Sequence, residues 1–115
     1  MRVMKFGGTS VGSAVQIRKV AGLIGNKSPK IVVLSAMSGT TNTLVEIAGT
    51  LKDGDRFRFG ELVGQLEFKY VETVNDLFGT ESCRRLAVDG MTDCFRTLWK
   101  MPQAGYTPEN EKVIL

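Results

Sequence analysis

The stretch MRVMKFGGTSVG, residues 1–12, decides the fold of the first half of the chain. A short apolar segment with Lys5 near its end runs directly into two glycines and two hydroxyl side chains. Ser13 and Gln16 then have the spacing of a capping box, and apolar residues recur at helical intervals until Gly25. The stretch therefore predicts a strand, a glycine-rich turn and a helix.

The same order of elements recurs further along the chain. Residues 31–35 form a continuous β-branched run, which is typical of a strand covered on both faces. A polar turn over residues 35–42 follows, and a second helix is indicated by the one-sided placement of Leu44, Val45, Ala48 and Leu51. Strand, turn and helix, repeated over residues 1–54, predict an α/β fold with a parallel sheet.

Residues 55–101 have a different character and predict a helical hairpin. The first helix has an apolar face made of Phe59, Leu62, Val63, Leu66, Tyr70, Val74, Leu77 and Phe78. Gly60 and Gly64 lie within it and weaken it by about 1 kcal/mol each relative to alanine. The second helix follows a turn at residues 79–80 and is expected to end before Pro102.

The two cysteines, Cys83 and Cys94, fall on the apolar stripe of this second helix. We expect both to be buried as small hydrophobic side chains, without a redox role. Trp99 is expected to serve packing and not as a platform for a ligand.

Residues 102–115 are interpreted as the start of a truncated segment. Thr107 and Pro108 have the order of a helix N-cap followed by proline at the first helical position, yet the sequence stops on an apolar run at Leu115. Two strands alone also make a poor parallel sheet. We therefore expect residues 1–115 to be a partial domain, the front portion of a larger one.

The composition excludes several classes of site. The chain has 115 residues, two cysteines and no histidine, so it cannot build a Ser-His-Asp triad, a Cys-His pair or a four-thiolate zinc site, and no metal-ligand set stands out. No apolar run approaches the ~20 residues of a membrane helix, and the N-terminus does not read as a signal peptide. A cytoplasmic protein without membrane contact is expected.

The charge is spread unevenly along the chain. Residues 1–54 hold seven Lys and Arg against two acidic residues, a net charge of +5, whereas residues 55–115 have a net charge of −2. An anionic ligand is therefore expected at the first half. A nucleic acid is not favoured, because Phe6 is the one aromatic residue in this basic half and stacking platforms are lacking.

The glycine-rich turn is the strongest candidate for chemistry. Adjacent glycines allow close approach of a ligand, successive N–H groups before a helix form an anion cradle, and Lys5 adds a full charge. The P-loop spacing is nearly present at Gly7 and Gly12, but the lysine after the second glycine is missing. From the residues alone, a plain strand-to-helix turn and a non-catalytic nucleotide- or anion-binding module both remain open.

Two motifs carry a resemblance to a known family. Residues 5–11, KFGGTSV, resemble the opening of aspartate kinases in the amino acid kinase family, and residues 33–42, VLSAMSGTTN, resemble that family's second loop. The resemblance is close over residues 1–48 and fades through the helical hairpin. The short segment Glu111-Lys112-Val113 is similar to what precedes the family's next motif.

The resemblance implies the N-terminal part of a three-layer α/β/α sandwich and a kinase that uses ATP and Mg²⁺. Its reaction would phosphorylate the side-chain carboxylate of L-aspartate, the first step towards lysine, threonine and methionine. Lys5 would neutralise charge on the transferring phosphoryl group, and Gly7 and Gly8 would offer N–H groups to the ATP phosphates. The full-length enzyme would be a homo-oligomer.

The remaining implied roles concern hydroxyl side chains. Thr9 and Ser10 would support the glycine loop in binding ATP, and Ser35 and Thr41 would help hold aspartate, although such hydroxyls are often helix caps. The acceptor carboxylate is already ionised at neutral pH, so a chain without histidine suits this reaction. Further family residues that bind aspartate, metal and nucleotide would lie beyond Leu115. The 115-residue chain by itself is expected to be inactive.

Overall fold

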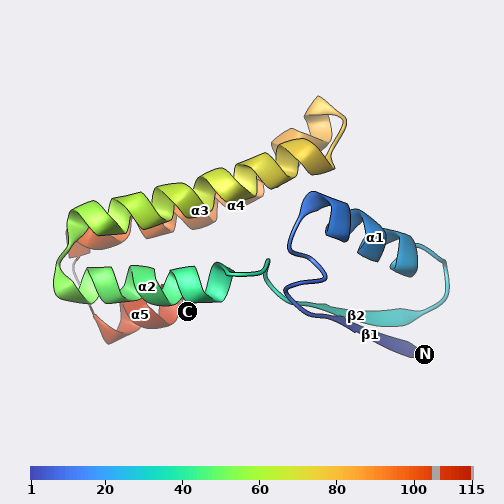
Figure 1. Ribbon diagram of the computed structural model, residues 1–115, viewed down its shortest axis with the longest axis horizontal. Helices are drawn as coiled ribbons and strands as arrows, with labels where there is room; N and C mark the ends of the chain where they lie inside the picture. Colours follow the sequence, from blue (N-terminus) through green and yellow to red (C-terminus); the bar gives the residue numbers. More distant parts are fainter. Residues whose placement is uncertain (105–106, 115) are drawn as a thin grey trace. The chain divides into compact units, whose positions relative to one another are not determined.

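A computed structural model describes residues 1–104 and 107–114. These residues form two compact units, the first ending at Thr40 and the second beginning at Thr41. Within the described residues there are two strands and five helices, labelled in Figure 1. In chain order they are β1 (Arg2–Phe6), α1 (Ala14–Ile24), β2 (Lys30–Leu34), α2 (Thr40–Asp53), α3 (Arg56–Leu77), α4 (Glu81–Ala104) and α5 (Pro108–Ile114).

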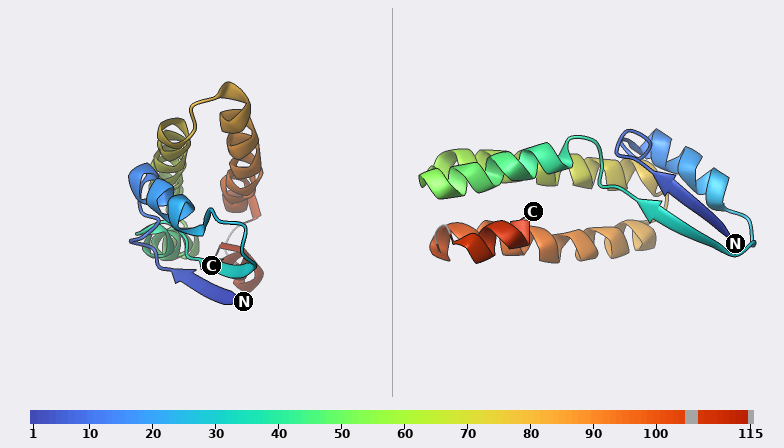
Figure 2. Two further views of the ribbon diagram at one scale, coloured as in Figure 1. Left: turned by 90° about the vertical axis from the view of Figure 1, so that its right-hand side faces the viewer. Right: turned by 90° about the horizontal axis from the view of Figure 1, so that it is seen from below.

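The first unit is a β-α-β arrangement. β1 and β2 pair in parallel, in a register that joins Arg2 to Lys30 at one end and Phe6 to Leu34 at the other. α1 lies along one side of the two strands (Figures 1 and 2). The Oγ of Ser13 accepts the Gln16 N–H at 3.3 Å, and Gly25 is the C-cap. The predicted strand, turn and helix are therefore confirmed.

Lys30 connects the end of α1 to the beginning of β2. Its ammonium group donates to the Ile24 carbonyl at 2.7 Å, to the Asn26 carbonyl at 2.9 Å, and to the Asn26 Oδ1. The last carbonyls of a helix have no partner within the helix, and the helix dipole favours a cation at that end. Lys30 therefore satisfies both requirements with one side chain.

The three-layer α/β/α sandwich expected from the resemblance is wrong for this chain. The described residues contain a single two-stranded sheet, and the described part of the second unit consists of helices and their connections, with no strand. One face of the sheet carries the exposed side chains of Val3, Ile31 and Val33, with exposed fractions of 66%, 50% and 46%. The expectation that β2 is covered on both faces is therefore also wrong. The β-branched run at residues 31–35 predicts a strand correctly. Strand propensity does not indicate which elements pack on the strand, so it could not predict how far the strand is buried.

The second unit is built on the helical hairpin of α3 and α4, which lie side by side in Figures 1 and 2. Both predicted helices are present. α2 and α5 contribute Ile47 and Ile114 to the same core, and Tyr70 meets Phe95 edge to face with ring centroids 6.2 Å apart. The buried side chains are Ile47, Ala48, Leu51, Phe59, Leu62, Val63, Leu66, Phe95, Met101 and Ile114. No helix in the described residues has both the length and the apolarity needed to cross a membrane.

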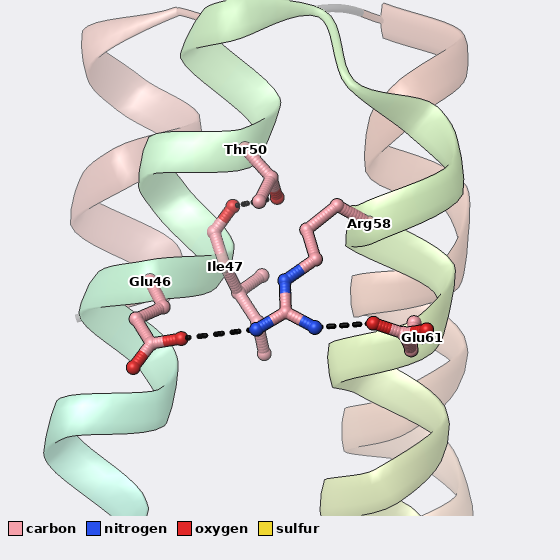
Figure 3. A network of polar contacts seen from close by, with 5 residues as sticks. All are labelled: Glu46, Ile47, Thr50, Arg58 and Glu61. Atoms are coloured by element: carbon pink, nitrogen blue, oxygen red, sulfur yellow. Dashed lines mark hydrogen bonds and ion pairs between the residues drawn. The ribbon is translucent and has the colours of Figure 1, made fainter.

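A polar network joins α2 to α3 on the surface of this unit, as Figure 3 shows. Arg58 on α3 lies 3.7 Å from a carboxylate oxygen of Glu46 on α2, and it also pairs with Glu61 one turn further along α3. Thr50 donates its hydroxyl hydrogen to the Ile47 carbonyl at 2.7 Å. The Arg58 side chain is 45% exposed, so these ion pairs contribute little to the stability of the unit.

Two expectations about α4 require correction. α4 continues through Pro102, which stands in its last turn, where proline removes only one of the final hydrogen bonds. The Pro102 carbonyl accepts a hydrogen bond from Arg56 at 3.2 Å. Cys83 and Cys94 are exposed, not buried. α4 packs along α3 through a narrow seam that includes Phe95 and Leu98, and the cysteines lie outside that seam.

Trp99 is 42% exposed, and the buried part of its ring contacts α3. Alanine methyl groups at Gly60 and Gly64 would lie 3.7 and 3.9 Å from the Trp99 ring. Since those distances are ordinary van der Waals contacts, the two glycines lie next to the indole ring. Their cost in helix propensity is offset by this contact between α3 and α4.

Candidate functional site

The candidate site lies at the carboxyl ends of the two parallel strands, within residues 1–40. We call residues 7–12 the glycine loop and residues 35–39 the second loop. β1 leads into the glycine loop, which is folded by hydrogen bonds from the Ser10 N–H to the Gly7 carbonyl at 3.0 Å and from the Gly12 N–H to the Thr9 carbonyl at 3.4 Å. Ligands of parallel α/β units bind at this edge, because loops and helix N-termini converge there.

The two loops contact each other directly. The Ser35 N–H donates to the Phe6 carbonyl at 3.0 Å, which fixes the beginning of the second loop beside the end of β1. A methyl group placed on Gly8 would lie 3.2 Å from the Ala36 carbonyl oxygen, and one placed on Gly12 would lie 3.4 Å from the Ser38 Cβ. The backbone of the glycine loop is thus packed against the backbone of the second loop.

The glycine loop keeps donors available for a ligand. Within the described residues, the N–H groups of Gly7 and Gly8 are not used by the hydrogen bonds that fold the loop. The space beside the Gly7 Cα is open, with no heavy atom within 4 Å of the position that a Cβ would take. Two adjacent donors beside open space match the requirement for an anion cradle.

Most of the residues predicted for the site lie on these two loops or beside them. Lys5 is exposed in β1, across from Val33 in β2. Thr9 is exposed and Ser10 half-buried in the glycine loop, and Ser35 is exposed at the start of the second loop. Thr41 is exposed in the first turn of α2 and belongs to the second unit. The roles assigned to these side chains stay predictions.

The electrostatics of the first unit favour anions strongly. Residues 1–40 contain six Lys and Arg and no Asp or Glu, which is a sharper asymmetry than the +5 of residues 1–54. A segment of one sign concentrates ligands of the opposite sign at its surface. Both substrates implied by the resemblance, ATP and aspartate, are anions.

The first unit offers no carboxylate side chain to bind the Mg²⁺ that the resemblance implies. Mg²⁺ prefers carboxylate oxygens, and residues 1–40 contain none. No group of three or more His, Cys, Asp or Glu side chains gathers anywhere in the part of the chain that the structure describes. We therefore assign no chemical step to a metal held by these residues.

Sequence reasoning missed the contact partners of the glycine loop. The sequence indicates Gly12 only as part of an incomplete P-loop pattern, and nothing in it singles out Ala36 or Ser38. Their contacts join positions about 30 residues apart in sequence, so no local pattern could reveal them. A hollow of about 290 Å³ also lies between the end of α2, the start of α3 and Pro102, and none of the predicted site residues lines it.

Comparisons with known proteins give a consistent result. No protein-family profile matches the chain. The aspartokinase of Chlamydia trachomatis is 33% identical over 104 residues, which cover 75% of this chain and 24% of that protein. The lysine-sensitive aspartokinase 3 of Escherichia coli is 37% identical over 71 residues, 61% of this chain and 16% of its own length. An aspartate kinase of Pseudomonas putida is 47% identical over 55 residues, 44% of this chain and 13% of its own length.

The chain spans about a quarter or less of the length of these curated relatives. The resemblance that the two loop motifs carry is nonetheless confirmed, because the relatives from Chlamydia, Escherichia and Pseudomonas are all named as an aspartokinase or aspartate kinase. The chain belongs to the aspartate kinase family and corresponds to part of such a protein.

Proposed function

We propose that this chain supplies the phosphate-binding loop and part of the acceptor-binding surface of an enzyme that phosphorylates L-aspartate with ATP. The product is 4-phospho-L-aspartate, the first intermediate on the route to lysine, threonine and methionine, and the reaction takes place in the cytoplasm. The observation that carries the proposal is the direct contact of the glycine loop with the second loop, in a unit that holds six basic residues and no acidic one.

The proposed reaction depends on the positioning of the two substrates and on stabilisation of charge on the transferring phosphoryl group, and it needs no proton transfer to activate the nucleophile. A carboxylate oxygen of aspartate forms a bond to the γ-phosphorus of ATP while the bond from that phosphorus to the β,γ-bridging oxygen breaks, and ADP leaves. The nucleophile is ionised before it binds, so no general base has to activate it. Lys5 and the Gly7 and Gly8 N–H groups are suited to stabilise charge on the transferring phosphoryl group.

The acceptor side of the proposal rests on hydroxyl groups. Ser35 lies next to the end of β1 through its N–H bond to Phe6, so its exposed side chain is at the same sheet edge as the glycine loop. Thr41 is proposed as the second hydroxyl that binds aspartate. The remaining acceptor contacts and the Mg²⁺ ligands are assigned to residues outside this chain, and the 115-residue chain alone is proposed to be inactive.

Calorimetric titration of the 115-residue chain with Mg-ATP tests the nucleotide part. Lys5→Ala is expected to weaken binding at least about tenfold, because it removes the charge beside the loop. Lys27→Ala is the matched control, since Lys27 is exposed in the same unit, and it is expected to change the affinity by less than about twofold. Equal weakening by both substitutions would remove Lys5 from the site, and a wild-type chain that does not bind would contradict nucleotide binding by this segment.

A coupled assay for ADP separates catalysis from binding alone. The complete enzyme that contains this chain is expected to form ADP only when aspartate is present, and the 115-residue chain is expected to form none. ADP formation without aspartate dependence would favour the alternative, a nucleotide-binding module without this acceptor.

A further inference from the structure

The three glycines of the glycine loop have different surroundings. A Cβ added to Gly8 would lie 3.2 Å from the Ala36 carbonyl oxygen and 3.5 Å from the Ser38 N and Cα. A Cβ added to Gly12 would lie 3.3 Å from the Gly8 carbonyl oxygen and 3.4 Å from the Ser38 Cβ. A Cβ added to Gly7 would meet nothing within 4 Å. A side chain would therefore be crowded at positions 8 and 12 and has room at position 7. At Gly8 the close neighbours belong to the second loop, whereas at Gly12 they are the Gly8 carbonyl oxygen of the same loop and the Ser38 Cβ of the second loop.

The atoms that Gly8 meets have little freedom to move away. They belong to the backbone of the second loop, whose beginning is held by the Ser35 N–H bond to Phe6 at 3.0 Å. Its end is closed by the bond from the Thr40 N–H to the Met37 carbonyl at 3.1 Å, and Met37 is 8% exposed. A methyl group on Gly8 would therefore displace the second loop as a whole by a few tenths of an ångström, because no single flexible side chain can give way.

We propose that Gly8 and Gly12 are positioning residues that set the separation between the glycine loop and the second loop. This inference rests on the proposed function, in which one loop holds the ATP phosphates and the other helps to hold aspartate. The bare Cα atoms allow the two backbones to touch, and that contact fixes how far the acceptor carboxylate lies from the γ-phosphorus. Ser38 is the partner whose Cβ completes the contact at Gly12.

The proposal predicts a division between binding and turnover. A small displacement of one loop against the other leaves the groups within each loop where they were. Alanine at position 8 also keeps the backbone N–H that is proposed to bind the ATP phosphates, so each substrate keeps its own contacts. In-line transfer, however, depends on the alignment of the two substrates, and small misplacements slow such reactions strongly. Substitution at Gly8 should therefore lower kcat and leave KM for both substrates nearly unchanged.

Steady-state kinetics of the complete enzyme that contains this chain test the proposal. Gly8→Ala is expected to lower kcat about tenfold or more, with both KM values within about twofold of the wild type. Gly7→Ala is the matched variant next to it, and it is expected to raise KM for ATP, since it fills the open space beside the loop. A Gly8→Ala enzyme with normal kcat, or with a raised KM for ATP as its main defect, would overturn the positioning role.

A rescue experiment separates the two glycines. Ser38→Gly removes the Cβ that lies 3.4 Å from the added methyl group of Gly12→Ala but leaves the Gly8 carbonyl oxygen at 3.3 Å, so the double variant should recover only part of the kcat lost by Gly12→Ala. The same Ser38→Gly change should not rescue Gly8→Ala, because Gly8 meets backbone atoms that every residue has. Equal rescue of both variants, or rescue of neither, would contradict the assigned contacts.

Amide chemical shifts of the 115-residue chain test the contact between the glycine loop and the second loop without any measurement of catalysis. Gly8→Ala is expected to shift the amide signals of residues 36–38 while those of the middle of α1 stay in place, and Gly7→Ala is expected to leave residues 36–38 unshifted. Loss of all dispersed signals would show that Gly8→Ala prevents folding, and Gly12→Ala then carries the test. If the complete wild-type enzyme forms no ADP with aspartate, the proposed function is refuted. The contact between the two loops is refuted separately, by amide signals of residues 36–38 that do not shift in the Gly8→Ala variant.

Discussion

Substitution of Lys30 by methionine removes the one ammonium group that closes the end of α1. The change keeps most of the side-chain length and apolar stem, so the loss falls on three hydrogen bonds. One of them reaches the partly buried Ile24 carbonyl at 2.7 Å, and the other two reach Asn26 in an exposed position. The substitution therefore tests how far a single cation stabilises the junction of α1 and β2.

The expected magnitude follows from the burial of the acceptors. A hydrogen bond between a charged donor and a partly buried carbonyl contributes about 1.5 kcal/mol, at the low end of its range. The attraction of the ammonium to the C-terminal end of the helix adds about 0.5 kcal/mol. The exposed bonds to Asn26 add little, because water competes for both partners. The total is about 2 kcal/mol.

Native-state hydrogen exchange of the α1 amides measures this free energy in the unit where it acts. A loss of about 2 kcal/mol corresponds to roughly 30-fold faster exchange in the last turn of α1. Lys27→Met is the matched control, because Lys27 is exposed in the same connection and donates no hydrogen bond within the described residues. If both variants exchange at the same rate, the contribution assigned to Lys30 is refuted.

Three further predictions concern the second unit. Phe59 is 2% exposed and Phe57 is 82% exposed on the same helix, so Phe59→Ala should lower the free energy of unfolding by about 3–5 kcal/mol and Phe57→Ala by less than about 1 kcal/mol in urea titrations. Gly90→Ala adds a methyl group in the interior of α4 that meets nothing within 4 Å. It should raise the free energy of unfolding by about 1 kcal/mol, which a urea titration shows as a higher midpoint, and a lower midpoint would contradict the open space. Cys83 and Cys94 should both react with a thiol reagent without denaturant, and protection of either would place it in the core.

The elements that sequence reasoning located correctly are those with a local cause. Ser13 and Gly25 delimit α1 through contacts within a few residues, and Asp55 begins α3 by accepting the Arg58 N–H at 3.0 Å. Such signals are visible in the sequence because both partners are close along the chain. The type and order of the elements could be predicted for the same reason.

The features that sequence reasoning missed depend on what packs against an element. The apolar stripe predicted for α4 was wide enough to include Cys83 and Cys94, but α3 covers only the narrower seam with Phe95. The apolar run of β2 indicated a strand correctly and its burial wrongly, for the same reason. Apolar periodicity reports the face that a helix or strand can bury, whereas its neighbours decide how much of that face is covered.

The candidate site shows the same division. Lys5, Gly7 and Gly8 could be singled out because their types follow one another directly before a helix. The contact of Gly8 and Gly12 with the second loop could not, because it forms only when two parallel strands bring distant turns together. The sequence therefore identified the residues that can bind an anion, and the structure added the contact that places the two loops against each other.

The two-stranded sheet has a consequence for the solution behaviour of the chain. Within residues 1–104 and 107–114, each strand pairs along one side only, so the outward N–H and C=O groups of both β1 and β2 can accept an additional strand. Val3, Ile31 and Val33 add an exposed apolar surface beside these unpaired backbone groups. Concentrated solutions of the 115-residue chain are therefore expected to form β-rich assemblies that begin at the β-α-β unit, while the helical hairpin remains unchanged.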